Sequence, residues 1–293
     1  MENNPQEIAC SICGANRVSF FTEKEGFSIF RCEECGHGMV HPMPQTTEEI
    51  YGQDYFAGAE GGFGYADYDA DKEPLRPFLD AQLREAERLL RGSARRMLDV
   101  GAATGFFLEI ARNRGWEVAG VEISAFAAEL ARKKGIDVKT GILAQHEFPK
   151  GAFDAVTLWD VIEHVEDPKA ELSRVREVLA PEGLLIMTTP NFTSLYARLL
   201  GKKWHAIVPP EHLHYFTFKS MDRLLADSGF EAISITAPVK SFTLAYVFQT
   251  LARWQGVKAW QHVANFLKKH PRMGSLSFPI PLRDNMLVFA RKK

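Results

Sequence analysis

Residues 95–122 constrain the fold of this 293-residue chain more than any other stretch. An apolar run of strand length, residues 95–100, leads into the turn Gly101-Ala-Ala-Thr-Gly105. A helical pattern and a second apolar run follow, and that run ends in Glu122. This order predicts a parallel α/β sheet that binds a nucleoside at the carboxyl ends of its strands. The glycines let the ligand approach the backbone, and the acid accepts hydrogen bonds from both ribose hydroxyls.

The turn differs from the G-x-G-x-x-G of dinucleotide enzymes. Asp99 stands before the first glycine, and Ala103 stands where a second glycine is common. An aspartate would repel a pyrophosphate, but it can attract the ammonium group of an amino acid joined to a nucleoside. The turn therefore favours a zwitterionic nucleoside ligand.

Further motifs follow the turn in a recognisable order. They are Gly151-x-Phe-Asp before an apolar strand, Asp160-Val-Ile-Glu-His164 after it, Glu166-Asp-Pro168, Pro181-Glu-Gly183 before LLIMTTP, and two final strand patterns at 231–238 and 284–293. With the glycine turn, they resemble the class I S-adenosylmethionine-dependent methyltransferases over residues 95–238 and 284–291. The resemblance implies a Rossmann-like sheet of seven strands with an antiparallel last strand.

The resemblance also implies which residues meet S-adenosylmethionine. Asp99, Gly101, Ala103, Gly105 and Glu122 would bind it. Ile123 and Leu143 would sandwich the adenine, and Trp159 and Asp160 would lie near the sulfonium or the acceptor. Leu143 and Trp159 fit a buried core equally well. Ile142 stands near the position where the family often has an acid for the adenine amino group, so Gln145 or His146 would have to replace that contact.

The four cysteines form the pattern Cys10-x2-Cys13 and Cys32-x2-Cys35. Their spacing predicts a structural zinc site with four thiolates and no open position. The alternative is four unrelated buried thiols. Residues 1–44 are thus expected to form a zinc ribbon with a hairpin that turns at Gly26. A ribbon of this kind ahead of the methyltransferase motifs resembles one bacterial branch, which includes sugar methyltransferases.

Residues 45–94 form a second N-terminal part. Their first half is rich in Gly, Tyr and Asp, which is typical of either a linker or an aromatic lid over an active site. A helical pattern follows from Pro74. Residues 1–73 carry fourteen acidic and four basic side chains. This acidity argues against contact with nucleic acid.

Two histidine-containing segments are candidates for the chemistry. His164 follows the strand that ends at Trp159, and His212 and His214 follow a Pro-Pro pair in the next long loop. Any of these imidazoles could act as a general base at neutral pH, or could only hold its loop in place. Asp160, Glu163 and His164 with His212 or His214 also resemble a divalent-cation set of some O-methyltransferases, although Asp160 is shorter than the usual glutamate.

Residues 239–283 are expected to be a helical insertion between the last two strands of residues 95–293. The pattern indicates two helices that break near Gly256, with aromatic and basic side chains interleaved. Three roles fit: a packed helix pair or dimer surface, a lid that attracts an anionic acceptor, or a peripheral membrane contact. The basic balance of residues 239–293, ten against one, suggests that they flank one cleft with the acidic N-terminal part.

We therefore expect a cytoplasmic methyltransferase, since the polar start MENNPQEIAC is no signal peptide and no apolar run is long enough to span a membrane. Its acceptor would be a small molecule or a glycan precursor, methylated at oxygen. One alternative is a C-methyltransferase acting on a nucleotide-linked sugar. The other is a module that binds S-adenosylmethionine and partners without turnover.

Overall fold

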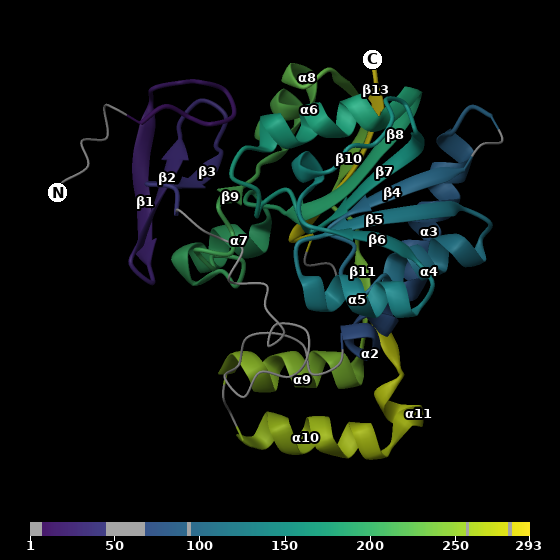
Figure 1. Cartoon of the computed structure of the whole chain (residues 1–293). Helices are drawn as coiled ribbons and strands as arrows, with labels where there is room; N and C mark the ends of the chain where they lie inside the picture. Colours follow the sequence, from purple (N-terminus) through teal and green to yellow (C-terminus); the bar gives the residue numbers. More distant parts are fainter. Residues whose placement is uncertain (1–7, 45–67, 93–94, 256–257, 281–282) are drawn as a thin grey trace.

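A seven-stranded mixed sheet forms the centre of the molecule (Figure 1). The computed structural model describes residues 8–44, 68–92, 95–255, 258–280 and 283–293. The strand order is β10-β13-β8-β7-β4-β5-β6. The strands are β4 (Arg96–Val100), β5 (Glu117–Glu122), β6 (Asp137–Thr140), β7 (Phe153–Trp159), β8 (Leu179–Pro190), β10 (Phe230–Thr236) and β13 (Asn285–Lys292). Strands β4 to β8 are parallel, and β13 is antiparallel to both of its neighbours, which confirms the expected methyltransferase topology.

Neighbouring residues of a strand point to opposite faces of the sheet, so apolar strands place apolar side chains on both faces. Helices cover both faces and bury these side chains. Met97 packs with one apolar cluster and Leu98 with the other. The helices of the first face are α3 (Arg76–Leu89), α4 (Phe106–Asn113) and α5 (Ala125–Lys133), and those of the second are α6 (Pro168–Val178) and α8 (Phe218–Asp227). The buried strands therefore read as continuous apolar runs, which is why they stand out in the sequence.

Strand β8 starts earlier than the apolar run LLIMTTP suggests. It spans Leu179–Pro190, and its pairing with β7 moves from Leu179 opposite Phe153 to Leu184 opposite Ala155. The residues between them form an irregularity in which Glu182 has a φ of 61°. Pro181-Glu-Gly183 is thus part of this strand entry and does not only end the preceding helix.

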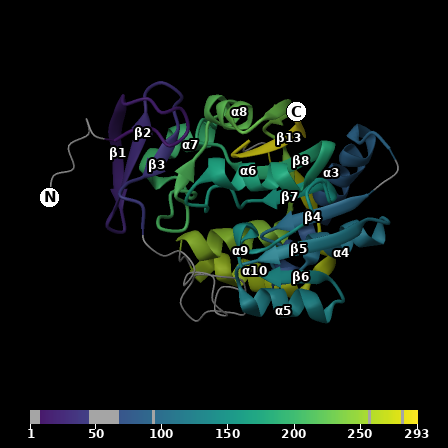
Figure 2. The ribbon, with the colours of Figure 1, turned by 45° about the horizontal axis from the view of Figure 1, so that its top comes forward.

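The N-terminal module is joined to the methyltransferase part through a shared sheet. Strands β1 (Val18–Lys24) and β2 (Phe27–Cys32) form the expected hairpin, with Gly26 at a φ of 80° in its turn. Strand β3 (Gly38–Val40) then pairs with β9 (His214–Tyr215), which lies far along the chain. Figures 1 and 2 show the module beside α7 (Leu195–Leu200), which precedes the short helix η5 (Gly201–Lys203).

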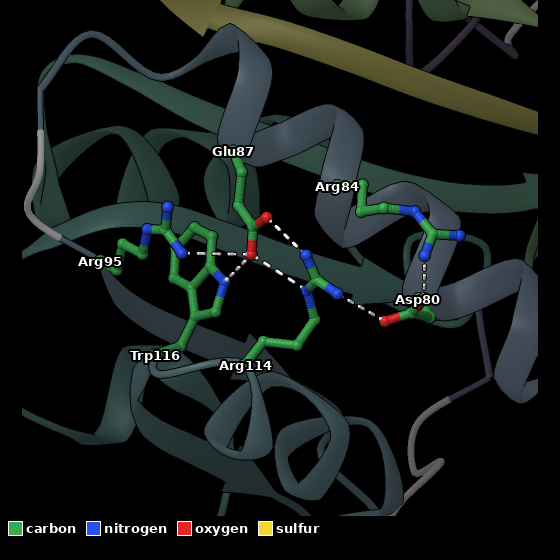
Figure 3. Close-up of polar contacts among 6 residues, drawn as sticks. All are labelled: Asp80, Arg84, Glu87, Arg95, Arg114 and Trp116. Atoms are coloured by element: carbon green, nitrogen blue, oxygen red, sulfur yellow. Dashed lines mark hydrogen bonds and ion pairs between the residues drawn. The ribbon is translucent and has the colours of Figure 1, made fainter.

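The helix before the sheet is fixed by a polar network. Helices α2 (Tyr68–Lys72) and η3 (Glu73–Leu75) lead into α3. On α3, Glu87 accepts hydrogen bonds from Arg114 and Trp116 and pairs with Arg95, while Asp80 pairs with Arg84 and Arg114 (Figure 3). The network joins α3 to the segment between α4 and β5. It therefore fixes the position of α3, which α2 and η3 precede in the chain.

The insertion contains both expected helices on either side of residue 256, and a small sheet that the periodicity did not indicate. Helices α9 (Leu244–Gln255) and α10 (Lys258–Lys269) pack against each other, and α11 (Pro271–Gly274) follows. Strands β11 (Lys240–Thr243) and β12 (Ser277–Ile280) pair at its base. β11 packs against η3, which places the insertion next to α2 and α3 (Figure 1). Among the described residues, no helix is long and apolar enough to cross a membrane.

Candidate active site

The glycine turn between β4 and α4 is tightly enclosed. Gly101 and Gly105 have φ angles of 76° and 78°, which favour glycine. A Cβ on Gly101 would lie 2.5 Å from a methyl carbon of Val161, and one on Gly105 would lie 2.8 Å from Ile136. Ala103, between them, also has a positive φ of 47°. Conformation and space therefore both require glycine at the two predicted positions.

Two buried carboxyl groups flank the turn. The Glu122 carboxylate at the end of β5 accepts hydrogen bonds from the backbone N–H groups of Ala103 and Ser124, each at 2.8 Å. Asp99 accepts one from the Thr157 hydroxyl at 2.6 Å. Burial raises the pKa of Asp99 to about 8, against the effect of the Thr157 hydrogen bond, and the charge of Glu122 raises it further. Burial also raises the pKa of Glu122, although the backbone N–H groups oppose this.

A cavity lies between this turn and the N-terminal helices. It is lined by Asp99, Gly101 and Ala102 from the turn, by Tyr68, Lys72, Leu75, Phe78 and Leu79 from α2 to α3, and by Phe106, Phe107, Trp159, Asp160 and Thr188. Its volume of about 60 Å³ is well below the roughly 300–1,000 Å³ of most small-ligand sites. The helices α2 and η3 thus form part of the wall of a cavity that is too small for a nucleoside in this structure.

Asp69 joins helix α2 to the glycine turn. Asp69 accepts hydrogen bonds from the Thr104 hydroxyl and the Lys134 ammonium group. Tyr68 packs against the cluster of Ala103 and Ala127. Neither residue is marked by any motif around the glycine turn. Residues 45–67, which hold most of the aromatic segment expected as a linker or lid, lie outside the described residues.

Trp159 and Asp160 end strand β7 at the cavity. The indole N–H of Trp159 is buried and has no hydrogen-bond partner in the described structure, although the ring packs against Phe107 at 4.9 Å. Asp160 has a φ of 54°, which is uncommon for a residue other than glycine. Its carboxylate accepts hydrogen bonds from Thr188 and Asn285 at 2.8 and 3.2 Å. A buried N–H donor and a strained acid at one cavity are typical of a ligand site.

The residues expected around an adenine ring lie just after strands β5 and β6. Leu143 is 1% exposed in the short helix η4 (Leu143–Gln145) and packs in the core with Val100 and Val121, while Ile123 is half-buried. Neither lines the described cavity. The side chain of Gln145 accepts a hydrogen bond from the Ile142 N–H at 3.1 Å, and His146 donates one to the Thr140 carbonyl at 2.9 Å.

His164 and His212 come together beside Glu163, just beyond Asp160. Their ring centroids are 4.7 Å apart, and one ligand atom from each of Glu163, His164 and His212 lies within 4.8 Å of the others. His164 Nδ1 donates to the Glu211 carbonyl and His212 Nδ1 to the Ala206 carbonyl, each at 2.8 Å. A carbonyl can only accept, so Nδ1 carries the proton in each neutral ring.

Both rings are neutral in this setting. Burial lowers the pKa of His164, and it lowers that of His212 to about 3. The charge of Asp160 opposes the lowering at both rings, which places this acid close to the pair. The cluster offers a buried carboxylate and two neutral imidazoles, a set of residues that suits a divalent cation as well as proton transfer.

His214 faces away from this cluster. It is 1% exposed, lies 3.1 Å from His37 of the N-terminal module through their ring nitrogens, and stacks on the same ring. Its other nitrogen donates to the Glu166 carbonyl at 3.3 Å. The structure therefore separates the two histidines of the loop: His212 joins His164, and His214 joins the module. His37 follows Cys35-Gly directly, but its position gave no indication of this partner.

The four cysteine sulfurs form one compact group. Cys10 and Cys35 Sγ are 3.7 Å apart, Cys13 and Cys32 Sγ are 3.6 Å apart, and all four lie within 4.8 Å of one another. Sulfurs about 2.3 Å from a tetrahedral Zn²⁺ would be separated by about 3.8 Å. The four residues expected as ligands thus have the spacing of a tetrahedral thiolate site.

Comparisons with known proteins agree with this fold. The profile of the methyltransferase domain family matches residues 72–235. A ubiquinone biosynthesis O-methyltransferase of Xanthomonas axonopodis is 26% identical over 159 residues, which are 51% of this chain and 66% of that protein, just under two thirds of it. The one from Alkalilimnicola ehrlichii is 29% identical over 189 residues, 60% of this chain and 76% of that protein.

A solved structure of an S-adenosylmethionine-dependent methyltransferase from Archaeoglobus fulgidus has the same fold. The TM-score is 0.50 at 20% identity, and the match covers 77% of this chain and 99% of that one. The family profile covers more than half of the chain, from α2 to the end of β10. The chain therefore belongs to the methyltransferase domain family and is an S-adenosylmethionine-dependent methyltransferase.

Proposed function

We propose that this enzyme methylates an oxygen atom of a small-molecule or glycan-precursor acceptor. The observation that carries the proposal is the pair of neutral imidazoles at His164 and His212, which lies just beyond the cavity acid Asp160. The curated relatives named O-methyltransferases support oxygen as the atom methylated. A hydroxyl acceptor needs a group that takes its proton, and a neutral imidazole serves that purpose.

The cofactor would bind between the glycine turn and α2. S-adenosylmethionine supplies a methyl group on a sulfonium that is open to in-line attack. Glu122 would accept hydrogen bonds from the ribose hydroxyls, Asp99 would attract the ammonium group, and Gly101, Ala103 and Gly105 would let the nucleoside lie against the backbone. The buried N–H of Trp159 would gain a partner there. Helix α2 would open to admit the cofactor and close over it, which excludes water.

The same cluster could also hold a divalent cation through Glu163, His164 and His212. Such an ion would lower the pKa of an acceptor hydroxyl and orient vicinal hydroxyls. Titration of the full chain with Mn²⁺, followed by the relaxation of water protons, measures this site separately from the cysteines. His212→Ala should weaken Mn²⁺ binding at least tenfold. Activity that survives chelation, with the zinc content unchanged, would exclude a catalytic role for the ion.

The N-terminal module would hold structural zinc on Cys10, Cys13, Cys32 and Cys35, as in the bacterial branch that it resembles. In this proposal the chain has three parts. Residues 1–44 form the zinc ribbon, residues 45–94 the aromatic segment and the helix after it, and residues 95–293 the methyltransferase domain. Because β3 pairs with β9, the module would serve the acceptor side of the enzyme and would not act as a separate binding domain.

The insertion 239–283 would close the other side of the acceptor site. It contains seven basic and no acidic residues, and β11 packs against η3, next to the cavity. Its exposed side chains Phe266, Leu276 and Phe278 also suit peripheral contact with anionic lipid. Sedimentation with phosphatidylglycerol vesicles decides between these roles, because a lid alone would leave the protein in the supernatant.

An acceptor screen with a labelled methyl donor tests the proposed reaction. The ¹³C chemical shift of the transferred methyl group distinguishes an O-methyl from a C-methyl product. His212→Ala and His164→Gln should lower turnover by about 10²–10⁴-fold with the cofactor affinity unchanged. A C-methyl product would refute oxygen as the acceptor atom, and full turnover in both variants would refute the assignment of the base.

A further inference from the structure

A second, larger groove lies between the N-terminal module and helix α7. Its volume is about 540 Å³, within the roughly 300–1,000 Å³ of most small-ligand sites. The hairpin β1–β2 forms one wall with Phe21 and Arg31. The other wall is formed by residues 192–201, among them Phe192, Thr193 and Arg198. None of the residues proposed for the methyl transfer lines it.

The groove is cationic because two guanidinium groups line it without a nearby acid. No carboxylate of the described residues lies within 4.0 Å of Arg31 or Arg198, whereas Arg17 on the same module pairs with Glu33 and Glu34. None of the lining residues is acidic. Lys202 and Lys203 lie in η5, after Gly201 of the groove wall, and are exposed, so they add positive charge near this wall. A site with this charge attracts anions.

Arg31 is held in place by an aromatic ring. Its guanidinium carbon lies 5.4 Å from the centroid of Phe192, in the arrangement of a cation–π contact. Phe192 is 7% exposed and packs edge-on against Phe21 at 5.3 Å and against Trp204 and Tyr215. The contact places the exposed guanidinium over this ring. An oriented guanidinium binds phosphate oxygens with two parallel hydrogen bonds.

The aromatic wall depends on a close approach between the two parts of the chain. A Cβ on Gly38 of β3 would lie 2.9 Å from both Phe192 and Tyr215. Tyr215 in turn donates to the His212 carbonyl at 3.0 Å. The groove is thus built by the docking of the module, and one aromatic layer separates it from His212.

We propose that this groove binds the phosphate or diphosphate group of a small-molecule ester, with Arg31 and Arg198 as the phosphate-binding residues and the ring of Phe21 as an apolar wall. The proposal goes beyond the methyl transfer and does not depend on which atom is methylated. The shared sheet brings Arg31 to α7, so the site exists only in the full chain.

Isothermal titration calorimetry of the full, zinc-loaded chain tests this site with inorganic pyrophosphate, uridine diphosphate and uridine. We expect both diphosphates to bind and uridine to bind at least tenfold more weakly. Arg31→Ala combined with Arg198→Ala should weaken diphosphate binding by tenfold or more. Arg31→Lys should restore only part of this loss, because a lysine keeps the charge but not the planar fork.

Arg17→Ala is the matched control, because it removes an arginine of the same module outside the groove. An equal loss in this variant would overturn the proposal, since binding would then follow net charge alone. Diphosphate binding unchanged in the double variant, or absent from the wild type at millimolar concentration, would also overturn it. The affinity for S-adenosylmethionine should stay unchanged in all variants, which separates this test from that of the methyl transfer.

Discussion

Two N-terminal segments pack against turns and loops that follow the central strands, and they are held by different kinds of contact. The N-terminal module shares backbone hydrogen bonds between β3 and β9, and buries His37 against His214. The Thr217 hydroxyl, at the start of α8, also donates to the Cys35 carbonyl at 2.7 Å. Helix α2 is held by side chains, chiefly through the partly exposed Asp69. A shared sheet lasts as long as the fold does, whereas a few side-chain contacts can break and form again at low cost.

Loss of one cysteine should have the largest effect, because it would remove a ligand of the zinc ion proposed for the module. Cys32→Ser is expected to lower the midpoint of thermal unfolding by at least about 10 °C. Scanning calorimetry together with measured zinc content checks this. Ser19→Ala, an exposed change in β1, is the control. If the zinc-free Cys32→Ser protein unfolds at the same temperature as the wild type, the module does not depend on metal.

The turn beneath α2 should depend most on Glu122. Replacing it by Ala or Gln should weaken S-adenosylmethionine binding about 100-fold, since each hydrogen bond to a charged group contributes about 1.5–3 kcal/mol. Calorimetric titration measures the change. Glu122 also holds the turn through two backbone N–H groups, so circular dichroism must show that both variants are folded. Wild-type affinity in a folded variant would refute the assignment of this pocket.

Asp99 should make cofactor binding depend on pH. Its pKa of about 8 means that the free protein carries a proton there at neutral pH. An ammonium group favours the ionised form, so binding releases that proton and the affinity should rise with pH up to about 8. The rise is at most tenfold per pH unit. Asp99→Asn should bind more weakly and lose this slope. If the cofactor affinity of Asp99→Asn still rises with pH as in the wild type, the released proton comes from another group.

The substitution Asp69→Asn in helix α2 should have the smallest effect of the four. We expect the cofactor to dissociate a few-fold faster and the thermal midpoint to change little, because a partly exposed ion pair contributes about 0.2–1 kcal/mol. Hydrogen exchange of the amides in residues 68–75 should speed up at the same time. Asp137→Asn, an exposed acid on β6, is the control. A large fall in the midpoint of thermal unfolding of Asp69→Asn would mean that the contacts of α2 stabilise the whole fold, as those of the N-terminal module do.

The elements that the sequence predicts well are those that leave a local pattern, such as apolar periodicity, glycine at a turn or regular cysteine spacing. The strands, the turn at Gly101 and Gly105 and the cysteine group follow from apolar runs, positive φ angles and spacing. Contacts that join distant segments leave no such signal. Nothing near His37 indicates His214, and nothing near Asp69 indicates Thr104, because each pair meets only through the tertiary fold. The rotation of the chain between His212 and His214, which turns them to different partners, is likewise set by the pairing of β9 with β3.

The pairing of β3 with β9 also sets an order of events during synthesis. His37 and His214 are separated by 177 positions. At roughly 5–20 residues per second, the ribosome needs about 9 to 35 s to make that stretch. The nascent module would have this time to bind the proposed zinc ion, but the edge of β3 stays without its partner strand. An open strand edge invites pairing with other chains. We therefore expect the chain to be more prone to aggregation during synthesis than after β3 and β9 have paired.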